Sequence, residues 1–150
     1  MNNENTEASV KARKQIPIQE GLFHQPASPS EKPYLLGTRC TACGNVTFPR
    51  MEICPRCVKK GTMEETGIEG KGRIDTFSIV QAALPGFKAP SIQAYINLDA
   101  GPRIWSLIVD NETSGKDLKI GMEVELIIAP VRVDEQGNEL VSYQFRPVRS

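Results

Sequence analysis

The chain has few of the residues that enzymes most often use for nucleophilic and acid–base chemistry. Its 150 residues include one histidine, His24, and four cysteines. It also has no excess charge of either sign, because 18 basic residues balance 18 acidic ones. A zero net charge argues against a nucleic-acid binder that works through an overall basic surface. No apolar run approaches the ~20 residues of a membrane helix, so we expect no membrane partner.

The amino terminus shows no targeting signal. Residues 1–7 are polar, and neither an apolar stretch nor a cleavage site follows them. We therefore expect a cytoplasmic protein, in a compartment where free thiolates persist. The 12 glycines and 11 prolines fit short strands and turns better than helices.

The four cysteines form two C-x2-C motifs separated by ten residues. Cys40 and Cys43 make the first pair, and Cys54 and Cys57 make the second. This spacing presents four thiolates to one tetrahedral metal ion, either zinc or, in a rubredoxin-like variant, iron. Two disulfides of a secreted protein are the alternative, but nothing else in the sequence indicates secretion. A site with four protein thiolates has no open position, so its role is structural.

The residues before and around the cysteines divide into an arm and a small metal-dependent module. Residues 16–24 are apolar and form either a short helix or an extended arm. Residues 25–33 contain three prolines and are typical of a stiff linker. We predict an N-terminal tail and arm over residues 1–32 and a zinc ribbon over residues 33–62. A ribbon of this size is too small to fold without its metal.

The remainder, residues 63–150, has the pattern of a β-barrel. Ile92, Ala94, Ile96 and Leu98 fall on one face of a strand. We predict five strands, over residues 72–80, 91–99, 103–109, 123–133 and 140–146. A short helical turn within residues 112–121, ending at Gly121, follows the third strand. Five strands with this insert favour a closed OB-type barrel, with a β-sandwich as the alternative. The whole chain is therefore predicted to be mostly β.

The order of several short motifs resembles a known family. The motifs are LGTRCTACGNVTFPR, CPRC, GKGRIDTFSIV, LPGF and LDAGP, and together they lie within residues 16–148. They are similar to the acyl-CoA-associated zinc-ribbon/OB-fold proteins, long filed as a domain of unknown function. Val58 departs from the pattern because a glycine often follows the last cysteine, which puts the local turn geometry in doubt.

The resemblance implies a role in acyl-CoA chemistry. Members of the family are small partner subunits of sterol-carrier-type thiolases, related aldolases or hydroxymethylglutaryl-CoA synthase-like enzymes. It implies a non-catalytic accessory subunit that docks on a thiolase-like catalytic subunit in a hetero-oligomer. The coenzyme A thioester would be a ligand shared with that partner, and zinc the chain's own metal. Within the family, the sequence also resembles the branch that acts in anaerobic toluene degradation.

The residues themselves predict that the isolated chain is inactive. Covalent catalysis needs a free nucleophile and a base, and all four cysteines are assigned to the metal. His24 lies in the arm beside prolines, where we interpret it as an exposed or interface residue. Asp75, Asp99 and Asp110 have no evident carboxylate partner, and no P-loop, G-x-S-x-G or H-x-x-x-H motif is present. The chemistry is expected to reside in another polypeptide.

An apolar loop is the second candidate site. Residues 82–91 join two predicted strands and have a proline near each end. An apolar loop on a rigid barrel rarely exists only to face water. It either folds over the barrel mouth or lines an acyl-pantetheine channel at a partner's active site. Given the resemblance we favour the channel, formed by Pro85, Gly86, Phe87 and Lys88 with Phe87 at the tip.

Nucleic-acid binding is the alternative function. Residues 39–60 carry a local net charge of +4, from five cations and one glutamate. This patch is either solvated surface or a site for phosphates or an acidic partner. OB-folds bind single strands through aromatic residues interleaved with basic ones. The barrel's aromatic residues fall at strand positions and are interpreted as mostly core: Phe77, Tyr95, Trp105, Tyr143 and Phe145. We therefore rank single-stranded nucleic acid second.

Overall fold

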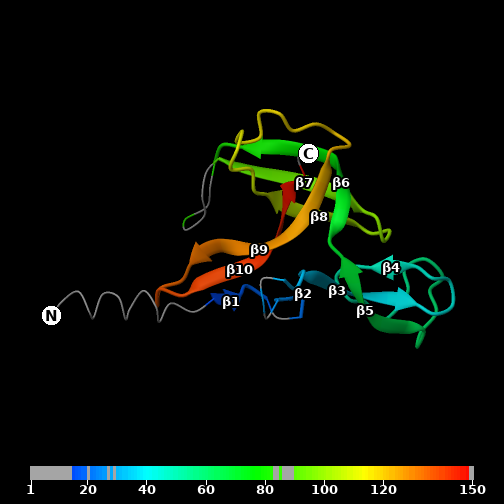
Figure 1. The fold of residues 1–150 in the computed structure, drawn as a ribbon. Helices are drawn as coiled ribbons and strands as arrows, with labels where there is room; N and C mark the ends of the chain where they lie inside the picture. The colour runs from blue at the N-terminus through cyan, green and yellow to red at the C-terminus, as the bar shows by residue number, and fades with distance from the viewer. Residues whose placement is uncertain are drawn as a thin grey trace.

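The computed structural model describes residues 15–19, 21–26, 28, 30–82, 85 and 90–148. Over these residues it contains ten β-strands and no helix, which confirms the mostly β prediction. The strands form a four-stranded sheet and a six-stranded sheet. Figure 1 shows the first as a small ribbon beside the larger barrel, with β5 running from the ribbon toward β6 of the barrel.

The ribbon sheet is built around β3 (Tyr34–Cys40). It pairs antiparallel with β2 (Phe23–His24), β4 (Val46–Thr47) and β5 (Met63–Glu69). The pairing with β5 runs along the whole of β3, from Tyr34 opposite Glu69 to Cys40 opposite Met63. The five strands predicted from the sequence did not include this segment. Its side chains are largely exposed apart from Ile68, so it lacks a strong apolar alternation.

The barrel consists of five strands: β6 (Lys71–Val80), β7 (Ser91–Leu98), β8 (Arg103–Ile108), β9 (Glu123–Val133) and β10 (Glu139–Pro147). Antiparallel pairs join β6 to β7, β7 to β8, β9 to β10 and β6 to β9. A parallel pairing of β8 with β10 closes the cylinder. This order is that of an OB-type barrel, as predicted.

The predicted inward face of β7 is confirmed. Ile92, Ala94, Ile96 and Leu98 are each at most 8% exposed. Phe145 of β10 is fully buried in the same cluster. The cluster continues into the base of the ribbon, where Leu35 and Ile68 are also buried, so the two parts share apolar packing.

The prediction of a helical insert between β8 and β9 is wrong. Residues 111–117 form consecutive turns instead. The Asp110 carboxylate accepts the backbone N–H groups of Glu112, Thr113 and Gly115, which fixes the chain in a turn. Ser114 and Gly115 have φ angles of 53° and 87°, and a left-handed backbone at two successive residues interrupts a right-handed helix. Gly121 has a φ of 90° but ends no helix.

The arm is extended, so its helical alternative is also wrong. β1 (Gln15–Pro17) pairs in parallel with β10, and β2 pairs with β3. Pro17 lacks a backbone donor, and Gly21 has a φ of 81°, so neither favours helical hydrogen bonds through this segment. Residues 1–14, for which a tail was expected, lie outside the described residues.

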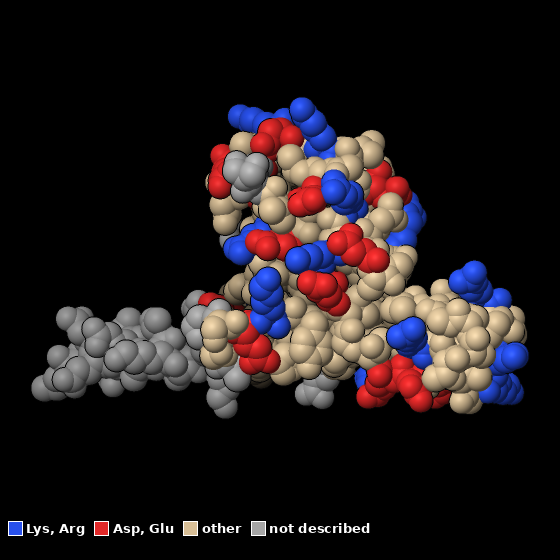
Figure 2. Space-filling model, turned by 45° about the vertical axis from the view of Figure 1, so that its right-hand side comes forward, with Lys and Arg blue, Asp and Glu red and all other residues tan. Residues whose placement is uncertain are grey.

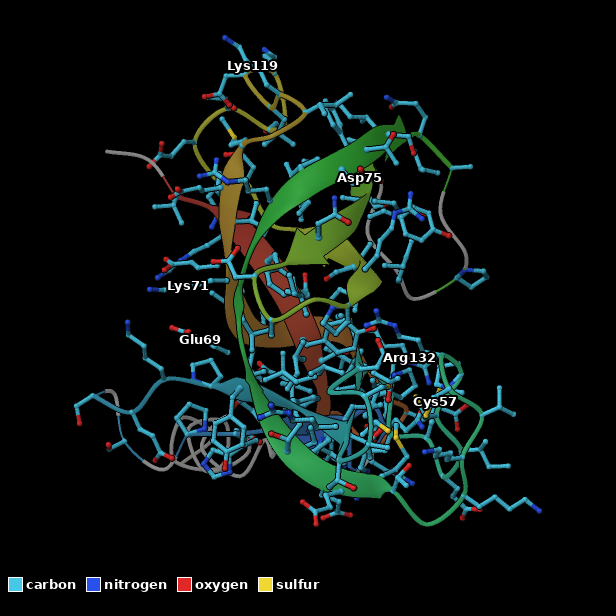
Figure 3. All side chains as sticks on the ribbon, turned by 90° about the vertical axis from the view of Figure 1, so that its right-hand side faces the viewer. Cys57, Glu69, Lys71, Asp75, Lys119 and Arg132 are labelled. Atoms are coloured by element: carbon cyan, nitrogen blue, oxygen red, sulfur yellow. The ribbon has the colours of Figure 1, made fainter. Side chains whose placement is uncertain are left out.

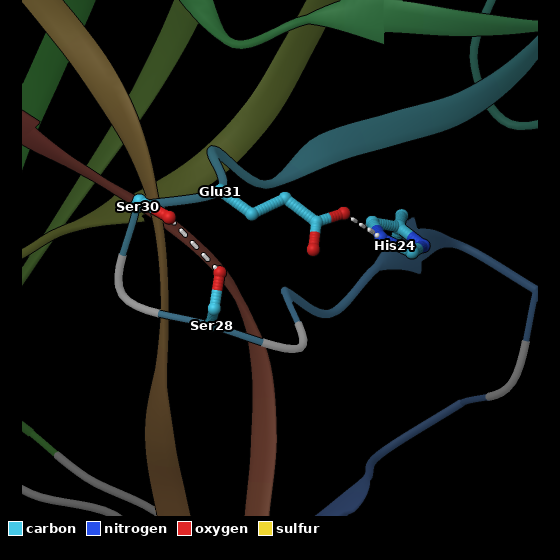
Figure 4. A network of polar contacts seen from close by, with 4 residues as sticks. All are labelled: His24, Ser28, Ser30 and Glu31. Carbon is cyan, nitrogen blue, oxygen red and sulfur yellow. Dashed lines mark hydrogen bonds and ion pairs between the residues drawn. The ribbon is translucent and has the colours of Figure 1, made fainter.

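His24 attaches the arm to the ribbon. Its Nε2 atom lies 2.6 Å from the Glu31 Oε1 atom, and the Ser28 and Ser30 hydroxyls meet nearby at 3.1 Å (Figure 4). The imidazole also stacks on the Tyr34 ring, with 4.6 Å between ring centroids. His24 therefore has a structural role, in packing and hydrogen bonding between the arm and the ribbon.

A single glycine connects the last strand of the ribbon to the first strand of the barrel. Gly70 separates β5 from β6, and its carbonyl accepts the Leu126 N–H at 2.8 Å. A Cβ atom at this position would collide with the Leu126 side chain, so only glycine lets β9 approach so closely. Phe48 of the ribbon packs edge-on against Tyr143 of β10, with 5.3 Å between centroids. β5 (Met63–Glu69) pairs with β3 and so belongs to the ribbon sheet. The domain boundary placed at residue 63 stays a prediction.

Candidate metal centre and barrel groove

The four cysteines converge at one point. All four Sγ atoms lie within 4.8 Å of one another. The Cys40 and Cys57 sulfurs are 3.7 Å apart, and those of Cys43 and Cys54 are 3.6 Å apart. A tetrahedral zinc ion with Zn–S bonds of about 2.3 Å requires sulfurs about 3.8 Å apart, so this cluster fits one. Figure 3 labels Cys57, with yellow sulfur atoms beside it.

Two matching turns bring the cysteines together. In the first, the Gly44 N–H donates to the Cys40 carbonyl at 2.8 Å, and in the second the Val58 N–H donates to the Cys54 carbonyl at 2.9 Å. Gly44 has a φ of 80°, as expected for a knuckle glycine, and Val58 adopts 61° in the equivalent place. The departure at Val58 therefore leaves the turn geometry unchanged. A left-handed backbone costs a β-branched residue roughly 1–2 kcal/mol.

The turns also supply donors that stabilise thiolates. The Thr62 hydroxyl, 3.3 Å from the Cys40 sulfur, and the Cys43 N–H lower the pKa of Cys40 to about 6. The Cys57 N–H lowers the pKa of Cys54 in the same way. The Asn45 N–H lowers the pKa of Cys43, but burial and the neighbouring thiols outweigh it and raise the value to about 11. Donors therefore converge on the first cysteine of each pair.

Two of the three carboxylates considered in the sequence, Asp75 and Asp110, are held in structural networks. Asp75 accepts from Arg103 at 2.8 Å and from Asn97 at 3.2 Å, and the Arg103 hydrogen bond is the main reason that its pKa is lowered. Asp110 caps the turn after β8. The Thr113 hydroxyl lies 2.7 Å from Asp110 Oδ2 and 2.6 Å from Asp117 Oδ1, so these two carboxylates flank one hydroxyl. Inactivity of the isolated chain stays a prediction.

The barrel carries a groove of about 600 Å³ on its outer side. It is lined by Ile79, Ala82, residues 90–93, Trp105, residues 107–111, Ser114, residues 129–131 and Gln144, and we call it the barrel groove. It lies where β7 begins and β8 ends, facing the second half of β9. The loop site predicted next to it is mostly outside the described residues, since Pro85 is described but Gly86, Phe87 and Lys88 are not.

Two aromatic residues interpreted as core are exposed. Tyr95 and Trp105 are 42% and 44% exposed and lie opposite each other on the outer face of β7 and β8. The other described aromatic residues of the barrel are wholly or partly buried, namely Phe77, Tyr143 and Phe145. The sequence already indicated that Tyr95 is exposed, because it lies between Ala94 and Ile96, which both face inward. A period-two assignment sends its side chain outward.

The basic patch is less basic in three dimensions than along the chain. All five of its cations are exposed: Arg39, Arg50, Arg56, Lys59 and Lys60. Arg50 pairs with Glu65 at 2.6 Å, and Arg39 lies opposite Glu64 in the sheet. In Figure 2 a group of red side chains lies on the underside of the ribbon, and blue side chains lie at its top and outer end. The acidic strand β5, which the sequence analysis missed, therefore offsets much of the patch.

Comparisons with known proteins find the same two modules. A family model described as the rubredoxin-like zinc ribbon domain of ChsH2 matches residues 31–64, and one described as the C-terminal OB-fold domain of ChsH2 matches residues 65–129. A DUF35 domain-containing scaffold protein of Methanocaldococcus jannaschii is 39% identical over 123 residues, covering 80% of this chain and 86% of the relative.

Two further relatives are subunits or parts of enzyme complexes by name. Benzoylsuccinyl-CoA thiolase subunit BbsA of Thauera aromatica is 32% identical over 127 residues, covering 85% of each protein. A solved structure described as the Ltp2-ChsH2(DUF35) aldolase aligns with a TM-score of 0.61 at 25% identity. That alignment covers 76% of this chain and 84% of the other. Within the described part of this chain, no helix has the length and apolar character needed to cross a membrane.

Proposed function

Because this chain belongs to the ChsH2/DUF35 family of paired zinc-ribbon and OB-fold proteins, we propose that it is a non-catalytic accessory subunit of a thiolase-type acyl-CoA enzyme. The observation that carries the proposal is the match, over both modules, to proteins named as scaffolds and as a thiolase subunit. In this role the chain docks on a catalytic subunit and helps to form the acyl-CoA site. The coenzyme A thioester is then a ligand shared by the two proteins.

Thiolysis of benzoylsuccinyl-CoA, a step in anaerobic toluene degradation, is the specific reaction that we propose. BbsA proteins of two organisms are 32% and 28% identical to this chain over 85% and 77% of its length. The similarity spans both the ribbon and the barrel. This similarity supports a catalytic partner of the same class as that of BbsA. The identity of the substrate is a more specific part of the proposal.

We assign zinc to the four-cysteine cluster, with a structural role. When bound, the ion supplies a cross-link between the two knuckles and takes up the negative charge of the thiolates. The chain's own groups orient those thiolates through the Thr62 hydroxyl and the knuckle N–H groups. Elemental analysis of freshly purified protein distinguishes about one equivalent of zinc from iron.

Assembly with a catalytic partner tests the main proposal. The chain and the thiolase-type subunit of its own organism are expressed together and separately, and thioester cleavage is assayed for each alone and for the mixture. We expect a stable complex and activity only from it, because the isolated chain lacks a free nucleophile and base. Turnover by the purified chain alone, or failure to form any complex, would contradict the proposal.

Phe87→Ala tests the loop formed by residues 85–88. Burial of one phenyl ring contributes roughly 1.5–3 kcal/mol. If Phe87 packs against the acyl or pantetheine group, kcat/KM of the complex should fall about tenfold or more. Metal content and assembly should not change. Ile120→Ala is the control, because Ile120 is an exposed apolar residue of the loop before β9. An unchanged kcat/KM would leave the loop as a cover for the barrel.

Single-stranded nucleic acid is kept as the second candidate because of one observation. Tyr95 and Trp105 are exposed on the face over which OB-folds bind oligonucleotides. Against it, none of the described residues that line the barrel groove is a lysine or an arginine. Retention on single-stranded DNA with a steep salt dependence would favour this candidate over the first.

A further inference from the structure

The barrel groove occupies the part of the OB-fold that most often holds ligands. β7 and β8 are the second and third strands of the barrel, and OB-folds bind their ligands over these strands. Gln93 of β7 and Trp105 and Leu107 of β8 all line the groove. Its volume of about 600 Å³ lies within the range of small-molecule sites.

The described part of the lining favours an uncharged ligand. Its apolar surface includes Ile79, Trp105, Leu107 and Val131, and its neutral hydrogen-bonding groups include Gln93, Asn111 and Ser114. Among the described lining residues, Asp110 is the one ionisable side chain. Its Oδ2 atom accepts the Thr113 hydroxyl at 2.7 Å and the Gly115 N–H at 2.9 Å. The groove therefore offers no described cation for a phosphate or a carboxylate.

Hydrogen bonds hold the walls of the groove in place. The Tyr143 hydroxyl donates to the Trp105 carbonyl at 3.3 Å, which ties β8 to β10. The Gln144 amide, itself buried, donates to the Ala129 carbonyl at 3.1 Å and thereby fixes the opposite wall. A site whose walls are already ordered loses less conformational entropy when it binds a ligand.

We propose that the barrel groove binds the uncharged end of an acyl-CoA, namely the acyl group with the pantetheine arm beside it. The inference rests on the proposed function, since it names which part of the shared thioester this chain holds. An apolar acyl or aryl group packs on Trp105 and Leu107, and the amides of the arm meet Gln93, Asn111 and Ser114. The phosphorylated nucleotide end stays outside the groove.

The single tryptophan of the chain provides the readout. Because Trp105 lines the groove and no other tryptophan is present, intrinsic fluorescence reports on this site alone. The full-length, metal-loaded chain is titrated separately with benzoyl-pantetheine, with pantetheine and with adenosine 3′,5′-bisphosphate. We expect a saturable change with benzoyl-pantetheine, a weaker one with pantetheine and none with the bisphosphate. No response to benzoyl-pantetheine, or equal binding of the bisphosphate, would overturn the inference.

A pair of matched variants assigns the binding to the groove. Leu107→Lys places a charge in the apolar wall and should raise the Kd for benzoyl-pantetheine at least tenfold. Ile120→Lys makes the same kind of change at a residue that is 71% exposed and outside the groove, so the Kd should not change. Equal affinities for the two variants would place the ligand elsewhere. If the chain assembles with its catalytic subunit but the groove binds nothing, this inference alone is lost.

Discussion

The metal end of the ribbon and the interior of the barrel are stabilised in different ways. Around the cysteines, the large apolar side chains Met51, Ile53 and Val58 are 44%, 40% and 71% exposed. In the barrel, Ile96 and Phe145 are fully buried in a continuous cluster. Burial therefore stabilises the barrel, whereas the knuckles depend on the bonds of their four thiolates to a metal. One chain thus contains two regions that should respond to different perturbations.

Removal of one thiolate should give the largest difference between the two regions. Structural zinc sites contribute an apparent ~10–16 kcal/mol to the folding of small domains. Cys54→Ser should abolish stoichiometric metal binding and expose the amides of residues 40–62 to hydrogen exchange. The barrel strands should keep most of their protection. Chelation of the wild-type protein should reproduce this pattern, and addition of zinc should reverse it only in the wild type. Simultaneous loss of protection in β7 would show that the regions are not separable.

A change in the barrel interior should destabilise the barrel and leave metal binding unchanged. Phe145→Ala removes a fully buried ring and should lower the free energy of unfolding by roughly 3–5 kcal/mol. The metal content per folded chain should not change, because Phe145 lies outside the cysteine cluster. Thermal denaturation and elemental analysis measure the two quantities, and Phe145→Leu serves as a milder control. Loss of the metal in folded Phe145→Ala protein would contradict the separation.

The smallest expected effect is a gain in stability at Val58. Glycine relieves the left-handed strain of roughly 1–2 kcal/mol but loses about 0.4–1 kcal/mol through its freer unfolded chain. Val58→Gly should therefore stabilise the ribbon slightly and slow metal transfer to a chelator. Gly44→Val is the reciprocal variant and should speed that transfer, since Gly44 has a φ of 80°. If Val58→Gly releases its metal faster, the valine side chain makes a stabilising contact that outweighs the strain.

The features predicted correctly are those with a local chemical cause. Cysteine spacing specified the metal cluster, and the alternation of Ile92, Ala94 and Ile96 specified the inner face of β7. β5 was missed because its partners come from β3, which lies more than twenty residues earlier in the chain, and its own side chains are mostly polar. The barrel groove could not be predicted, because its walls come from strands that closure of the barrel brings together.

Gly70 has a further consequence for how this architecture can vary. β5 lies in one sheet and β6 in the other, with this single residue between them. Side chains along a strand alternate in direction. The number of residues between β5 and β6 therefore decides which side chains of β6 point into the barrel. One inserted residue would turn every inward side chain of β6 outward unless a bulge absorbed it, whereas two would restore the inward direction. Insertions of an even number of residues at this junction should therefore be tolerated better than insertions of an odd number.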